Sequence, residues 1–230
     1  MGRCPVCDGV LGIGERGVLC EKCLDKPEYV VSPFCIRCGK PLSDAMEEYC
    51  SDCKNRKLSF ECGRSAFVYE KNLKSSMYRF KYGGRREYSE FYGRTMLQMY
   101  GNWIKEIAPD AIIPVPIHKK RYIMRGYNQA ELIAKVIGKE MEIPVVTDVI
   151  LRTGDTLPQK ELNKEARMEN LIGAFAVSEY GKALCENCNC VIIIDDIYTT
   201  GSTMEACSRL LRQSGISNVF FMCVCIGKAE

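Results

Sequence analysis

Eight cysteines within the first 53 residues constrain this chain more than any other feature. They form four Cys-x-x-Cys pairs with gaps of similar length: Cys4 and Cys7, Cys20 and Cys23, Cys35 and Cys38, Cys50 and Cys53. Each pair can wrap two thiolates around one Zn²⁺, and two pairs close a tetrahedral site. Because segments this short bury too little apolar surface to fold unaided, the metal is expected to supply much of their stability.

The order of the pairs predicts two structural zinc sites. Sequential pairing assigns Cys4, Cys7, Cys20 and Cys23 to one ion and Cys35, Cys38, Cys50 and Cys53 to the other. A cross-braced arrangement would use the same ligands in alternate pairs, and the sequence leaves it open. Sulfur fills all positions at each site, which leaves none for water and indicates a structural role. Disulfides are the alternative, but they are typical of secreted chains.

A further group of cysteines lies near the C-terminal end, at Cys185, Cys188 and Cys190. It is interpreted either as a loop with incidental thiols or as part of a third metal site with Cys207 or Cys62. The sequence does not decide between the two.

The whole chain has 230 residues and a net charge of only +3, which suits one main domain and a small module. We expect a module over 1–60 and a domain over 64–230. Residues 71–86 and 118–125 are basic and contain no acid. Such stretches either attract phosphates or form a solvated face. No apolar run approaches the roughly 20 residues of a membrane span, and the N-terminus carries no apolar signal region, so a cytoplasmic protein is expected.

The rest of the chain alternates between two kinds of pattern. Strand-like runs cover 111–117, 143–151, 191–195 and 217–226, and helical spacing covers 87–107, 128–141 and 202–213. Strands that alternate with helices predict an α/β domain with a parallel sheet. Ligands of such sheets bind beyond the carboxyl ends of the strands.

The stretch VIIIDDIYTTGST, residues 191–203, combines a buried strand, two acids and a hydroxyl-rich loop before a helix. Backbone N–H groups, hydroxyls and the helix dipole in such a loop suit a phosphate. Asp195 and Asp196 accept hydrogen bonds but donate none, so they suit sugar hydroxyls, directly or through hydrated Mg²⁺. Both carboxylates are expected to face solvent.

This stretch resembles the PRPP-binding motif of type I phosphoribosyltransferases. The resemblance implies that Asp195 and Asp196 hold the ribose diol of PRPP with Mg²⁺. It also implies that the loop binds the 5′-phosphate through Thr199, Thr200, Gly201, Ser202 and Thr203. No catalytic residue is assigned.

Three further segments, PVPIHKKRYIMRGYNQAELIA, TLPQKELNKEARMENLIGAF and FKYGGRREY, resemble the ComF family, as does the cysteine-rich N-terminus. ComF proteins are competence-associated and phosphoribosyltransferase-like, with an N-terminal double zinc ribbon. By resemblance, the pyrophosphate lies near Lys119, Lys120, Arg121 and Arg125, and residues 156–170 form a mobile lid. Gly126–Gln129 also reads as a helix start with Asn128 as its N-cap.

The resemblance implies a role in nucleotide metabolism or in DNA uptake, with PRPP and the uptake machinery as partners. One hypothesis is an enzyme that transfers the phosphoribosyl group to an acceptor. Another is a non-catalytic PRPP or nucleotide sensor that binds single-stranded DNA, with Tyr78, Tyr82 and Tyr88 available for stacking. A purely structural adaptor would leave the PRPP motif unexplained. The sequence identifies neither the acceptor nor the oligomeric state.

Overall fold

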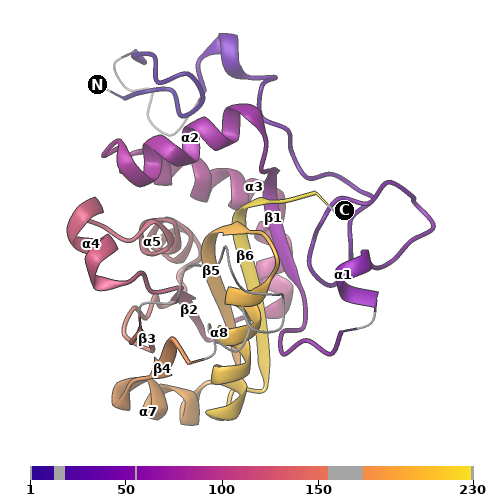
Figure 1. The fold of residues 1–230 in the computed structure, drawn as a ribbon, viewed down its shortest axis with the longest axis vertical. Helices are drawn as coiled ribbons and strands as arrows, with labels where there is room; N and C mark the ends of the chain where they lie inside the picture. Colours follow the sequence, from indigo (N-terminus) through magenta and orange to yellow (C-terminus); the bar gives the residue numbers. More distant parts are fainter. Residues whose placement is uncertain (1, 13–18, 55, 155–172, 229–230) are drawn as a thin grey trace.

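A computed structural model describes residues 2–12, 19–54, 56–154 and 173–228 of the chain (Figure 1). Its centre is a parallel four-stranded sheet with the spatial order β1 (Gly63–Val68), β6 (Asn218–Ile226), β5 (Cys190–Tyr198), β2 (Ala111–Pro114). The long helices flank this sheet: α2 (Lys71–Tyr82), α3 (Tyr88–Ile107), α5 (Gln129–Met141) and α8 (Ser202–Gln213). The predicted α/β fold with a parallel sheet is therefore confirmed.

The remaining elements are short. They are the 3-10 helix η1 (Glu21–Cys23), the helices α1 (Ser51–Lys54), α4 (Lys119–Arg125) and α7 (Glu179–Asn187), and an antiparallel pair of strands, β3 (Ile150–Arg152) and β4 (Phe175–Val177). Most cysteine-rich N-terminal residues lie in turns and loops between these elements.

Strand β5 is buried on both faces, which explains its run of β-branched residues. Ile192 and Ile194 pack with α2, α3 and α5, whereas Val191 and Ile193 pack with α8. Successive strand residues point to opposite faces, so a strand covered on both sides needs apolar residues at every position. The covering helices thus fix which side chains of β5 face which layer.

Several predicted elements have the expected bounds. The helix over 202–213 is confirmed, and α5 begins after Asn128, whose side chain accepts a hydrogen bond from the Ala130 N–H (3.1 Å). Asn128 also donates to the Val115 carbonyl (2.9 Å), and Val115 N–H donates to the Ile194 carbonyl. These bonds hold the end of β2 beside the end of β5.

Other predicted elements differ from the structure. The strand over 143–151 is wrong for most of its length: only its end enters β3, and Val145 makes a single bridge to Ile112. The basic stretch 71–86 contains α2, and residues 119–125 of the second basic stretch form α4. In α2 the buried residues Leu73, Met77 and Phe80 follow helical spacing, whereas α4 has no buried residue and therefore no apolar stripe.

The segment between the two groups of cysteines covers the edge of the sheet. Val30 N–H donates to the Ala66 carbonyl and Val68 N–H to the Glu28 carbonyl, and Tyr29 bridges Phe67 in antiparallel fashion. An uncovered edge strand presents free N–H and C=O groups that invite unwanted pairing. The N-terminal segment therefore completes the sheet next to β1.

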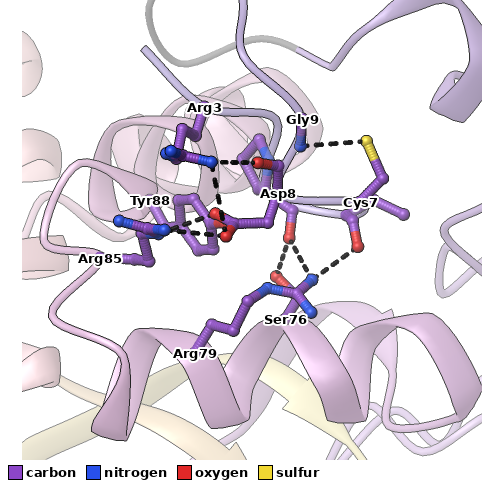
Figure 2. A network of polar contacts seen from close by, with 10 residues as sticks. Arg3, Cys7, Asp8, Gly9, Ser76, Arg79, Arg85 and Tyr88 are labelled. Carbon is purple, nitrogen blue, oxygen red and sulfur yellow. Dashed lines mark hydrogen bonds and ion pairs between the residues drawn. The ribbon is translucent and has the colours of Figure 1, made fainter. Parts of the chain in front are cut away.

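The first cysteine-rich loop is fastened to the corner between α2 and α3 through Asp8 (Figure 2). Arg85 donates to both Asp8 carboxylate oxygens (2.7 and 2.8 Å), and the Tyr88 hydroxyl donates to one of them (2.6 Å). The hydrogen bonds from Arg85 lower the pKa of Asp8 to about 2, although burial opposes the shift. Bidentate charge-assisted bonds of this kind are among the stronger polar contacts in proteins. From α2, Ser76 and Arg79 add bonds to backbone carbonyls of the same loop.

We predict that Asp8→Asn destabilises the protein by about 1–3 kcal/mol, because the neutral amide leaves the partly buried Arg85 without its charged partner. Urea unfolding of the zinc-loaded protein would measure the loss. Asp25→Asn, which alters an exposed acid in the same N-terminal segment, serves as the matched control and should change stability little. Equal stability of the two variants would contradict the prediction.

Candidate functional site

Two groups of four thiols come together in the described part of the chain. They are Cys4, Cys7, Cys20 and Cys23, and Cys35, Cys38, Cys50 and Cys53, with the sulfur atoms of each group within 4.8 Å of one another. This grouping follows the sequential assignment and not the cross-braced one. Four sulfurs at this spacing fit a closed, structural zinc site.

The two clusters differ in exposure. All thiols of the second cluster are buried, whereas Cys7 of the first is exposed and Cys20 is half-buried. In the second cluster, hydrogen bonds from Cys38, Cys50 and Cys53 lower the pKa of Cys35. The same hydrogen bonding raises the pKa of Cys38, and that of Cys53 is raised as well, so a metal ion that binds here has to displace protons from these thiols.

The third group of cysteines, Cys185, Cys188 and Cys190, does not come together as a metal site. Among the residues that the structure places, only the two N-terminal clusters bring three or more potential ligands together. Cys190 donates from its sulfur to the Ile107 carbonyl, and Cys207 is buried in the core beside α8. The interpretation of Cys185, Cys188 and Cys190 as incidental thiols therefore accounts for them.

The hydroxyl-rich loop leads from β5 into α8. Thr200 and Ser202 share a hydrogen bond between their hydroxyls (2.9 Å), and Gly201 has a φ of +77°. A Cβ at Gly201 would lie 2.3 Å from the Tyr198 hydroxyl oxygen, so both backbone and space require glycine. A small cavity of about 50 Å³ lies here, lined by Asp195, Ile197, Tyr198, Thr199, Thr200, Gly201, Ser202, Thr203 and Met204.

The second cysteine cluster lies in the same core as this loop. The Tyr198 ring stacks on Phe221 (5.0 Å between centroids), and Phe221 contacts Phe60 edge-on (4.9 Å). Burial, and next the thiols of Cys38 and Cys53, raise the pKa of Tyr198. Ser59, which follows the cluster, donates from its N–H and hydroxyl to Glu205 in the first turn of α8 (both 2.7 Å). The second cluster thus packs in the same core as the loop and is joined through Ser59 to the helix that follows the loop.

The two acids of β5 turn to opposite sides of the sheet. Asp195 lines the cavity by α8, whereas Asp196 forms an ion pair with Lys81 of α2 (2.9 Å). Strand geometry requires this separation, since neighbouring side chains alternate between faces. The expectation that both acids face solvent is therefore wrong: the Asp196 side chain is only 14% exposed. Both still lie beyond the end of β2, whose pairing with β5 stops at Ile194.

Burial, and next the charge of Asp196, raise the pKa of Asp195 to about 7. Its carboxylate accepts a hydrogen bond from the Asp196 N–H (2.8 Å), which offsets part of this effect. The site therefore holds two acids of different character, one poorly solvated and one paired with a lysine. A ligand that brings hydroxyl donors or positive charge would relieve the poor solvation of Asp195.

The sequence around Lys81 does not mark it as a site residue. It lies in FKYGGRREY, a segment that carried the family resemblance, but nothing in its local sequence indicates that it faces Asp196. Only the packing of α2 against the same face of the sheet brings the two together.

The basic residues assigned to pyrophosphate separate into two sets. Arg125 donates to the Tyr82 hydroxyl (2.9 Å) and to Gln129 (3.0 Å), and its guanidinium lies over the Tyr82 ring. Tyr82 belongs to the same turn of α2 as Lys81, so Arg125 lies near the acids. The other set is Lys119, Lys120 and Arg121, which are exposed on α4.

No helix in the described ranges is both long and apolar enough to cross a membrane.

We predict two zinc ions per chain in protein that is purified under reducing conditions without chelator. Cys7→Ser and Cys35→Ser should each lose one ion, because each removes a ligand from a different cluster. A mild chelator should remove the first ion sooner, since Cys7 is exposed while the second cluster is buried. Elemental analysis over time measures both results, and zinc-free fresh protein would contradict them. Cys190→Ser is the control and should keep both ions.

Both a protein family and several individual proteins match this chain. The Double zinc ribbon domain family matches residues 2–54. Competence protein F of Haemophilus influenzae is 29% identical over 228 residues, which cover 94% of this chain and 93% of that protein. Competence protein ComFC of Bacillus subtilis is 26% identical over 86% of this chain and 79% of its own length.

DNA utilization protein YhgH of Escherichia coli K12 is 25% identical over 97% of this chain and 96% of its own length. The resemblance to the ComF family is thus confirmed: the chain is a homologue of competence proteins F and ComFC and of YhgH over most of its length, with a double zinc ribbon at its N-terminal end.

Proposed function

We propose that this chain is a PRPP-binding, phosphoribosyltransferase-like protein that acts in DNA handling. The observation that carries the proposal is the edge of the sheet where β5 ends, with Asp195 beside a hydroxyl-rich loop that leads into α8. The relatives are competence and DNA utilization proteins, and we extend that role to this chain. We also propose that residues 1–60 and 64–230 are its two functional parts.

The chemistry of this edge suits a ribose that carries a 5′-phosphate. Asp195 and Asp196 would accept hydrogen bonds from the diol, and the loop would surround the phosphate with backbone N–H groups and hydroxyls. Carboxylate oxygens are also the ligands that Mg²⁺ prefers, so either acid would offer an oxygen to a Mg²⁺ that arrives with PRPP. The ion would supply neutralisation of the pyrophosphate charge.

As an enzyme, the protein would break the bond between C1′ of PRPP and the pyrophosphate oxygen while an acceptor forms a new bond at C1′. Arg125 would stabilise the charge that develops on the departing pyrophosphate. Lys119, Lys120 and Arg121 are proposed to reach the same group when ligand binds. The lid over 156–170, which would exclude water, lies outside the described residues and stays a prediction.

One residue, Thr199, bears on which base would serve as the acceptor. Phosphoribosyltransferases that use 6-oxopurines usually carry an Asp at the position of Thr199, where it assists proton transfer at N7 of the base. Thr199 offers only a neutral hydroxyl, which is a poor proton acceptor, and general-base help typically contributes 10²–10⁴-fold. We therefore do not expect hypoxanthine or guanine to be the acceptor.

We predict that Asp195→Asn and Asp196→Asn each weaken the binding of PRPP with Mg²⁺ by roughly 10–100-fold, the loss that follows when a charged hydrogen-bond acceptor is removed. Calorimetric titration of the zinc-loaded protein would measure it. Asp148→Asn, which alters an exposed acid in the same domain, is the matched control and should bind like the original. An unchanged titration curve for the double variant would refute the site.

A second candidate function is the binding of single-stranded DNA, and one surface, on α2, supports it. Tyr78 and Tyr82 on α2 are 67% and 51% exposed, with their rings 5.1 Å apart, and Arg125 lies over Tyr82. Exposed aromatic rings beside cations are the usual platform for unpaired bases. Tyr88, expected to take part, is buried against Asp8 and does not belong to this surface.

We predict that the variant Tyr78→Ala with Tyr82→Ala weakens binding of a labelled thymidine oligonucleotide by at least about fivefold, because each stacked base contributes about 1–3 kcal/mol. Fluorescence anisotropy at low salt measures this change. Tyr180→Ala removes a similarly exposed ring from α7 and should have little effect. Affinity should also fall steeply with added salt. Equal losses in the two variants would contradict a specific platform.

A further inference from the structure

Lys81 and Asp196 form an ion pair between two elements that are distant in sequence. Lys81 lies in the last turn of α2 and Asp196 lies near the end of β5, with 2.9 Å between the ammonium nitrogen and a carboxylate oxygen. Their side chains are 20% and 14% exposed, so water screens the pair only partly. The pair lies at the same edge of the sheet as the hydroxyl-rich loop.

The groups around Lys81 keep it charged. Burial tends to lower the pKa of Lys81, but the charges of Asp196 and Asp195 outweigh burial and raise it. The guanidinium of Arg125 opposes this rise from the side of α4. The ammonium of Lys81, which like that of an ordinary lysine is charged at neutral pH, thus lies against one of the acids that the proposed function assigns to sugar and metal.

We propose that Lys81 is the resident counter-ion of this site and that it competes with a divalent cation for Asp196. The proposal rests on the assignment of this edge as a sugar and metal site. The ammonium occupies one oxygen of Asp196 at 2.9 Å, and its positive charge opposes the approach of a second cation to the same carboxylate. Lys81 is thus a positioning residue that lowers the affinity for the ion alone.

A different role for Lys81 has an opposite consequence. If the ion pair served only to hold α2 against β5, its removal would loosen the site and weaken every ligand. If Lys81 competes with the cation, its removal leaves two uncompensated acids and strengthens cation binding. A gain of affinity therefore separates the two roles, because damage to the fold does not produce it.

The test is calorimetric titration of the zinc-loaded full chain with Mn²⁺ alone, in place of Mg²⁺. Lys81→Met should bind Mn²⁺ roughly tenfold more tightly than the original protein. Lys81→Arg keeps the charge and should stay near the original affinity. Lys74→Met is the matched control, since this exposed lysine on the same helix lies over the Tyr69 ring and not at an acid.

The double variant Lys81→Met with Asp196→Asn should lose the gain, because the freed carboxylate is then absent. Equal or weaker Mn²⁺ binding by Lys81→Met, or a gain that persists in the double variant, would overturn the proposal. Titration of the original protein with PRPP and Mg²⁺ tests the proposed function separately. If PRPP fails to bind there, that function fails, while the Mn²⁺ comparison still decides the role of Lys81.

Discussion

The position of β5 between β2 and β6 is the constraint on which the rest of this molecule depends. Parallel strands pair with β5 on both edges, and helices cover both of its faces. Its side chains therefore reach solvent only beyond Ile194, where β2 stops. Polar groups can follow the apolar run only beyond that point without a large cost of desolvation. The two acids and the hydroxyl-rich loop lie there for this reason, and so does the candidate site.

The two cysteine clusters reach this site from different directions. The first is fastened through Asp8 to the corner after α2, the helix that carries Lys81. The second shares a core with Tyr198 and is linked through Ser59 to Glu205 at the start of α8. Structural zinc would therefore stabilise not only the N-terminal segment but also two of the elements that form the ligand edge.

Lys81 also changes what the paired acids can do. Two neighbouring carboxylates at the end of a strand suggest one negative site, but alternation along the strand sends one to α8 and the other to α2. Asp196 is thus already neutralised by a lysine, and Asp195 is poorly solvated. A site of this kind suits a ligand that brings its own hydroxyls and cation better than it suits a free metal ion.

The sequence by itself determined the parts whose cause is local. Cysteine spacing predicted both clusters, a continuous β-branched run predicted β5, and Asn128 predicted the start of α5, because ligand reach, strand burial and helix capping act over a few residues. The tertiary structure alone decided that Lys81 faces Asp196, that Tyr88 is buried on Asp8, and that 143–151 is mostly not a strand. These outcomes depend on which distant elements pack together, and no local pattern contains that information.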